Sequence, residues 1–177
     1  MTDLNLEDLI TDIPDYPKPG VVFKDITTLL RDPEGFREVV DRIADHFADA
    51  GVTKVVGAEA RGFMIAAPVA YKLGAGFVPA RKPGKLPRET HSEEYALEYG
   101  FDRLEMHVDS IDANDVVLLV DDLIATGGTA VALVKMIENS GAKLAGMGFL
   151  MELTFLHPRE TMAEATDAEL FSLVQVD

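Results

Sequence analysis

The sequence has no cysteine, and it carries only 16 basic residues against 31 acidic ones in 177 positions. Without cysteine the chain has no disulfide framework, no thiolate metal site and no thiol nucleophile. A net charge of −15 argues against a nucleic-acid-binding protein, because such proteins attract phosphate with a basic surface. The sequence also lacks an apolar run of the roughly 18 residues that a membrane span needs. Residues 1–7 lack the basic and apolar regions of a signal peptide, so we expect a soluble cytoplasmic protein.

Apolar residues make up 47% of the chain, which is enough for a real core, and the length fits one domain over residues 1–177. The apolar periodicity alternates between strand and helix patterns along the chain. Predicted strands lie at 54–58, 76–81, 116–120, 144–153 and 171–176. Predicted helices lie at 4–13, from Asp32 toward Gly51, at 62–73 with a kink or late start at Pro68, and from Ala130 to a stop at Gly141. This order predicts an α/β fold with a mainly parallel central sheet flanked by helices.

Residues 82–94 form a polar segment with two prolines and a glycine. A long loop without secondary structure is uncommon inside a compact domain and is often a lid or a binding loop. Apolar alternation over 95–99 and 104–108 then predicts a strand or hairpin pair. Four of the basic residues are concentrated at the start of this region, namely Arg81, Lys82, Lys85 and Arg88. Such an island in an acidic chain fits either a local anionic ligand or an ordinary solvated loop.

The strongest functional signal is the segment Val116–Thr129, a buried strand that ends in Asp121 and Asp122 and passes into a loop of small residues. The loop residues are Ala125, Thr126, Gly127, Gly128 and Thr129. The backbone N–H groups of such a loop, its hydroxyls and the following helix dipole favour a bound phosphate. Two carboxylates beside a phosphate make sense if they accept hydrogen bonds from the hydroxyls of a sugar, with a cation nearby. The segment therefore predicts a ribose 5-phosphate site.

Two other phosphate-binding motifs are missing from the sequence: the Gly-x-x-x-x-Gly-Lys-Ser/Thr loop and the Gly-x-Gly-x-x-Gly turn after a strand. The Val116–Thr129 segment instead resembles the phosphoribosyl pyrophosphate (PRPP) motif of the type I phosphoribosyltransferases. Other segments, in order along the chain, resemble the adenine phosphoribosyltransferases of that family. They are Asp15–Ile26, Glu59–Phe63, Arg81–Pro87 and Leu97–Gly100.

The resemblance implies a purine salvage reaction in which adenine and PRPP give AMP and pyrophosphate with Mg²⁺, which reaches the site through PRPP rather than through direct protein ligands. Asp121 and Asp122 would bind the ribose hydroxyls, residues 125–129 the 5-phosphate, and Arg61 the pyrophosphate. The basic residues Arg81, Lys82 and Lys85 would also meet the pyrophosphate, partly from the neighbouring subunit of a homodimer. The resemblance further implies a small N-terminal hood at about 1–31, a flexible lid at about 82–100, and a strained, often cis, Glu59–Ala60 peptide.

For the base, the resemblance implies that Phe23 stacks on adenine and that Val22 and Leu153 line the same pocket. Lys24 stands where many members of the family carry Arg, and a lysine cannot make the bidentate contact of an arginine. Glu98 resembles the catalytic carboxylate of the family, on a lid that also carries Tyr99. A glutamate there can exchange a proton with a ring nitrogen while the closed lid excludes water.

Two alternatives stay open from the sequence. A related transferase could use a 6-oxopurine such as hypoxanthine, guanine or xanthine, whose oxygen needs a donor such as Lys24. A PRPP-binding regulator without catalytic activity is the other alternative, although the chain has no spare length or basic face for nucleic acid.

Overall fold

The computed structural model describes residues 4–96 and 100–177, and its centre is a five-stranded sheet. All neighbouring strands are parallel and follow the order β4-β3-β7-β8-β9. The strands are β3 (Lys54–Ala58), β4 (Gly76–Ala80), β7 (Val116–Ile124), β8 (Lys143–Leu153) and β9 (Leu170–Val176). The predicted α/β fold with a parallel central sheet is therefore confirmed. The carboxyl ends of all five strands meet at one edge of the sheet.

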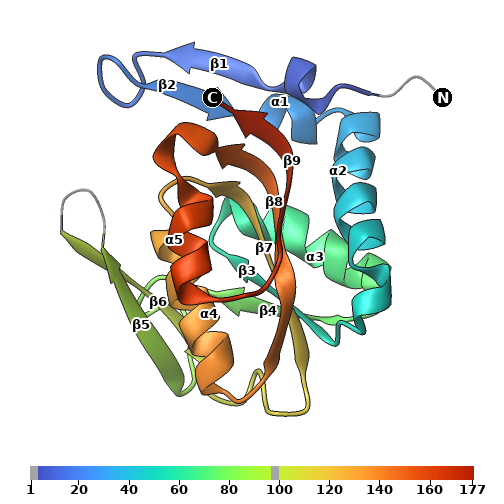
Figure 1. Cartoon of the computed structure of the whole chain (residues 1–177), viewed down its shortest axis with the longest axis vertical. Coiled ribbons are helices and arrows are strands. Elements are labelled where there is room, and N and C mark those ends of the chain that lie inside the picture. Colours follow the sequence, from blue (N-terminus) through green and yellow to red (C-terminus); the bar gives the residue numbers. More distant parts are fainter. Residues whose placement is uncertain (1–3, 97–99) are drawn as a thin grey trace.

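Helices cover both faces of this sheet (Figure 1). On one face lie α2 (Pro33–His46) and α3 (Arg61–Leu73), and on the other lie α4 (Gly128–Asn139) and α5 (Pro158–Ala165). Strand β7 shows why two cores form, because successive side chains of a strand point to opposite faces. Val117 and Leu119 join the core under α4, whereas Leu118 and Val120 join the core under α2 and α3.

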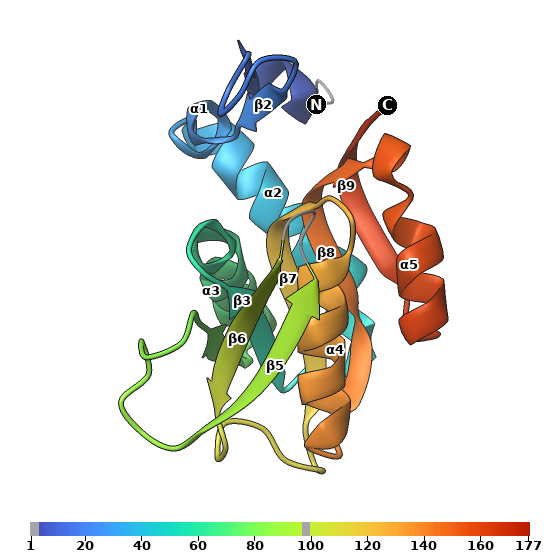
Figure 2. The same cartoon turned by 90° about the vertical axis from the view of Figure 1, so that its left-hand side faces the viewer.

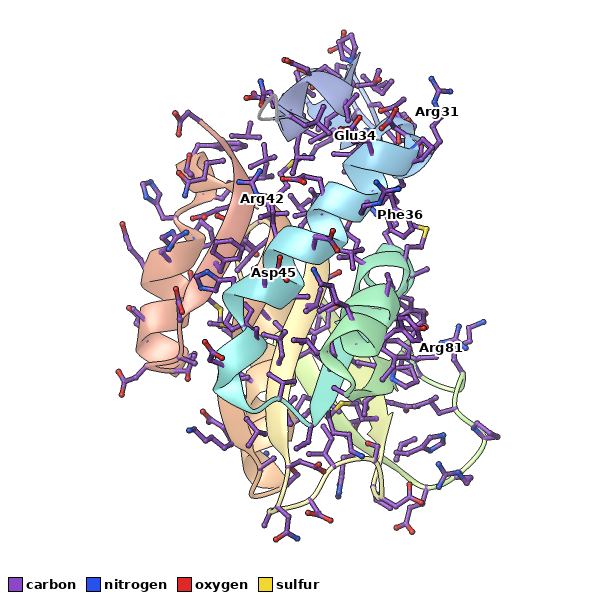
Figure 3. The ribbon with its side chains drawn as sticks, turned by 90° about the vertical axis from the view of Figure 1, so that its right-hand side faces the viewer. Arg31, Glu34, Phe36, Arg42, Asp45 and Arg81 are labelled. Carbon is purple, nitrogen blue, oxygen red and sulfur yellow. The ribbon has the colours of Figure 1, made fainter. Side chains whose placement is uncertain are left out.

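Helix α2 begins as the sequence predicts. Asp32 is its N-cap, and the carboxylate accepts hydrogen bonds from the backbone N–H groups of Glu34 and Gly35. The helix turns Val39 and Ile43 into the core, while Figure 3 shows Arg42 and Asp45 on its outer surface. It ends at His46, earlier than predicted, and a 3-10 turn (Ala48–Ala50) leads to Gly51 in the left-handed region.

The N-terminal region differs from the predicted helix over 4–13. Only Leu6–Leu9 forms a 3-10 turn, and β1 (Thr11–Pro14) follows it and pairs antiparallel with β2 (Val22–Asp25). Leu6 and Leu29, the latter in the short helix α1 (Thr27–Leu30), are buried against the core under α2. Figures 1 and 2 show this hairpin above the carboxyl edge of the central sheet.

The predicted loop over 82–94 is shorter than expected. Strand β5 (Thr90–Ala96) starts within it and pairs with β6 (Phe101–His107) as an antiparallel hairpin. The start of β5 was not predicted because its residues are mostly polar: Ser92 and Glu94 point outward, while Tyr95 is buried. Figure 2 shows this hairpin lying along α4, with the remaining loop swinging out beside it.

Two helices depart from expectation. Helix α3 runs through Pro68 without the predicted late start, although an interior proline costs about 3 kcal/mol. Its buried side chains, which include Ile65 and Val69, offset that cost. Helix α5 was not predicted at all. Within residues 4–96 and 100–177, no helix is long and apolar enough to cross a membrane.

Candidate active site

The predicted phosphate loop connects β7 to α4, and all five of its residues, 125–129, line one cavity of about 250 Å³. Gly127 is in the left-handed region with φ 91°, and as the N-cap residue of α4 it has no side chain with which to cap the first turn. Both glycines are also packed closely. A Cβ at Gly127 would lie 3.2 Å from Cγ2 of Thr161, and one at Gly128 would lie 3.1 Å from the carbonyl oxygen of Ala96. The loop can therefore offer backbone N–H groups to a phosphate.

The acidic pair lies inside β7 rather than after it, because the strand continues to Ile124. Asp121 accepts a hydrogen bond of 2.8 Å from the backbone N–H of Asp122, and its Oδ1 faces Gly62 on α3. Burial, and then the negative charge of Asp122, raise the pKa of Asp121 well above its ordinary value. Both carboxylates line the cavity of the phosphate loop, where hydroxyl donors of a sugar would offset their desolvation.

Asp122 is the more buried of the two residues, with 6% of its surface exposed. Its Oδ2 atom accepts no hydrogen bond from any described residue. Nε of Arg61, at the start of α3, lies 2.9 Å from this atom, so the contact is a charge pair without hydrogen-bond geometry. The Glu59–Ala60 peptide bond, which lies just before α3, is cis. The arrangement leaves a buried acceptor facing the cavity.

The three basic residues at the end of β4 have different surroundings. Lys82 lines the cavity and donates to the hydroxyl of Tyr95 and to the carboxylate of Asp102. Burial is the largest single influence and opposes the charged amine, but the hydrogen bonds that Lys82 donates to Asp102 and Tyr95, together with the charge of Asp102, outweigh it and raise the pKa of Lys82. Arg81 donates from Nε to Glu59 at 2.6 Å, and Figure 3 shows it beside α3 where the loop begins. Of these three described residues, Arg81 and Lys85 do not line the cavity.

A second, more apolar cavity of about 710 Å³ lies between β2 of the N-terminal hairpin and the ends of β8 and β9. All four residues predicted to bind the base line it, namely Val22, Phe23, Lys24 and Leu153. The ring of Phe23 packs edge-on against Tyr16 at 5.3 Å and under the guanidinium of Arg61 at 5.4 Å. An apolar cleft with a few polar groups is typical of a small-molecule site.

Lys24 is held by an ion pair, because its Nζ lies 2.7 Å from Oδ1 of Asp12 on β1. Three residues that were not predicted from the sequence also line this cavity, namely Ile26, Phe155 and Leu156. Phe155 and Leu156 follow the carboxyl end of β8 directly, which is where ligands bind in parallel sheets, so the position of the strand was a usable signal. Glu59, which lines the phosphate cavity after β3, carried the same signal.

Glu98 and Tyr99 lie outside the described residues, so their predicted roles stay predictions. The hairpin that leads to them reaches the site through Tyr95, whose ring lines the phosphate cavity. Across the described chain, no group of three His, Cys, Asp or Glu side chains converges to hold a metal ion. The two cavities share Arg61, Asp122 and Leu123 as a common wall.

Comparison with known proteins agrees with this geometry. Residues 25–175 match the model of the phosphoribosyl transferase domain. An adenine phosphoribosyltransferase from Maridesulfovibrio salexigens is 52% identical over 170 residues, which cover 96% of this chain and 100% of the relative. A crystal structure of adenine phosphoribosyltransferase from Thermoanaerobacter pseudethanolicus is 44% identical with a TM-score of 0.91, covering 97% of this chain and 100% of that one. The Giardia lamblia APRTase complexed with 9-deazaadenine has a TM-score of 0.91 at 36% identity, covering 97% of this chain and 96% of that one.

Proposed function

Because the chain belongs to the adenine phosphoribosyltransferase family, whose enzymes transfer the 5-phosphoribosyl group of PRPP to adenine in purine salvage, we propose that its two cavities hold these two substrates. The phosphate cavity would take PRPP, and the apolar cavity would take adenine. The observation that supports this division is the wall that the cavities share at Arg61 and Asp122. With the substrates divided in this way, the base would lie next to the ribose carbon that it attacks.

For PRPP, the N–H groups of residues 125–129 bind the 5-phosphate, and Asp121 and Asp122 accept hydrogen bonds from the ribose hydroxyls. Oδ2 of Asp122 supports this role, since it accepts no hydrogen bond from the described residues and a buried carboxylate oxygen is stabilised by a donor. Arg61 and Lys82 face the pyrophosphate. Lys82 must exchange its contact with Asp102 for the pyrophosphate, whereas Arg81 and Lys85 contribute from the rim or from the neighbouring subunit.

For adenine, Phe23 supplies the stacking surface, and Val22, Leu153 and Phe155 enclose the ring. Lys24 lies in the same cavity as a positive charge partly neutralised by Asp12. A free ammonium would favour the 6-oxygen of hypoxanthine or guanine, and the ion pair weakens that preference. The relatives, which are adenine phosphoribosyltransferases, also favour adenine over the 6-oxopurines.

The reaction forms a bond from a purine ring nitrogen to C1 of the ribose as pyrophosphate leaves, through an oxocarbenium-like state. The carboxylates of Asp121 and Asp122 stabilise the positive charge that develops on the ribose. Glu98 removes the proton from the purine ring as the new bond forms, and the closed lid keeps water from the activated sugar. Arg61 stabilises the charge that accumulates on the departing pyrophosphate.

We also propose that Mg²⁺ arrives bound to PRPP and neutralises the leaving pyrophosphate. The carboxylates of Asp121 and Asp122, which line the phosphate cavity, fit the approach of this ion together with its substrate. A homodimer in the cytoplasm completes the proposal. Exposed apolar side chains on α3 and on the edge strand β4, Met64, Tyr71 and Phe77, offer a surface for the second copy.

A panel of bases tests this function. Pure protein is incubated with Mg²⁺, PRPP and adenine, hypoxanthine, guanine, xanthine or a pyrimidine, and nucleotide and pyrophosphate are measured. We expect AMP from adenine and little turnover of the 6-oxopurines. Turnover of another base without turnover of adenine would reject the base assignment, and PRPP binding without turnover of any base would support a regulator.

A further inference from the structure

Glu152 is a buried carboxylate that touches neither cavity. It lies near the end of β8 with 1% of its surface exposed, and it directly precedes Leu153 of the adenine cavity. A carboxylate buried this deeply is unfavourable unless it is paired and fully hydrogen-bonded. The groups that surround Glu152 therefore indicate the structural role of its charge.

Three hydrogen bonds hold Glu152. Nε of Arg159 donates to Oε1 at 2.9 Å, Nη2 of Arg159 donates to Oε2 at 2.8 Å, and the hydroxyl of Ser172 donates to Oε2 at 2.7 Å. The same guanidinium donates from Nη1 to the carbonyl oxygen of Leu170 at 3.1 Å. Arg159 thus joins α5 to both β8 and β9 in a fixed orientation, because a two-pronged guanidinium contact sets direction as well as distance.

The segment between Glu152 and Arg159 forms the wall of the adenine cavity. It contains Leu153 and the 3-10 turn Thr154–Leu156, whose Phe155 and Leu156 line the cavity. The turn ends at His157, which takes the left-handed conformation with φ 53°. A non-glycine residue held there is under strain, so the turn needs an anchor on each side. The Glu152–Arg159 pair supplies that anchor across the turn.

Helix α5 also supports the other cavity. Its residues Thr161 and Met162 pack on the phosphate loop, with Thr161 Cγ2 at 3.2 Å and Met162 Sδ at 3.5 Å from the position of a Cβ at Gly127. One short helix therefore connects the wall of the adenine cavity with the back of the phosphate loop. Its orientation depends on Arg159, which follows the first residue of the helix.

We propose that Arg159, paired with buried Glu152, is a positioning residue that sets the adenine wall and the phosphate loop in register with each other. It touches no substrate and acts through α5 and the turn before it. This proposal rests on the placement of the two substrates given above. It predicts that loss of the pair weakens the binding of both substrates together, although neither substrate contacts the changed side chains.

The test uses a double variant, Glu152→Gln with Arg159→Met. Removing Arg159 alone would leave a buried charge unpaired and threaten the fold, whereas removing both charges keeps volume and avoids that penalty. We expect the double variant to fold, with KM for adenine and for PRPP each raised about tenfold and the Kd of AMP in calorimetry raised at least as much. Arg159→Lys keeps the charge but loses the fork, and it should show a smaller increase in both KM values.

Two controls separate positioning from general stability. Ser172→Ala removes one hydrogen bond to Glu152 and leaves the fork intact, so its KM values should stay within about twofold of the wild type. Lys72→Met removes an ion pair with Asp41 and Asp45 on the outside of α2 and should leave both KM values unchanged. A double variant with lower kcat but unchanged KM values would show a purely structural role and overturn the proposal. An increase in the KM for adenine alone would contradict the claim that Arg159 positions the two cavities relative to each other. Absence of adenine turnover by the wild type would refute the function itself.

Discussion

Gly62, the second residue of α3, faces the carboxylate of Asp121, and this contact leads to a sharp prediction. A Cβ at Gly62 would lie 2.4 Å from Oδ1 of Asp121 and 3.2 Å from its Cγ. Ordinary contact begins at about 3.4 Å, so Gly62→Ala must push the carboxylate by about 1 Å or shift the start of α3 by a similar distance. Either movement displaces groups that we assign to the ribose of PRPP.

The expected effect is large on activity and small on stability. A misplacement of about 1 Å can lower a rate about 100-fold, which corresponds to about 2.7 kcal/mol. For stability, alanine is favoured over glycine in a helix by up to about 1 kcal/mol, and a carboxylate forced off its rotamer costs about as much. The two terms nearly cancel, so we expect the Tm to change by less than about 4 °C.

The assay is steady-state kinetics with PRPP as the varied substrate, together with thermal unfolding of the same preparation. Gly76→Ala is the control. It lies at the start of β4, at the opposite edge of the sheet from the site, and the three atoms nearest to its Cβ would all belong to the flexible side chain of Lys54. The reasoning is refuted if Gly62→Ala keeps kcat/KM for PRPP within about threefold of the wild type. It is also refuted if activity falls only in proportion to folded protein.

Three further predictions concern the carboxylates that we assign to the site. Because the pKa of Asp121 is raised in the folded protein, its protonation stabilises the ligand-free protein fully below pH 3.8, the ordinary pKa, and this contribution is lost as pH rises through the raised pKa. Asp121→Asn should therefore flatten that part of the Tm–pH curve. An unchanged slope would contradict the assignment of this pH dependence to Asp121. Asp122→Ala should weaken PRPP binding about 10- to 100-fold in calorimetry, because a buried acceptor for the ribose is lost, and unchanged affinity would argue against the ribose role. Glu98→Ala should lower kcat about 100-fold or more with PRPP affinity within about threefold; near-normal turnover would exclude the acid–base role.

The amino-acid sequence by itself determined the loop over residues 125–129, which we propose to bind phosphate, and most of the framework around it. A central parallel strand is a continuous apolar run, and a glycine-rich turn that starts a helix binds phosphate through backbone geometry. Both signals are local, so Val116–Thr129 could be interpreted without any distant contact. The N-cap Asp32 and strand β3 were predictable for the same reason. The base was assigned by resemblance of short segments, and all four residues named for it do line one cavity.

Tertiary structure alone decided which distant groups meet. The pairing of Arg61 with Asp122, the contact of Lys82 with Asp102 and the anchoring of Glu152 by Arg159 join different elements, and no periodicity encodes them. The same holds for polar strand β5, which exists because β6 pairs with it rather than because its residues alternate in polarity. Val116–Thr129 thus specifies, by local backbone preference, a strand and a loop that we propose to bind phosphate. Its place beside the cavity that we propose for adenine depends on long-range packing of α5 and the N-terminal hairpin around the carboxyl edge of the sheet.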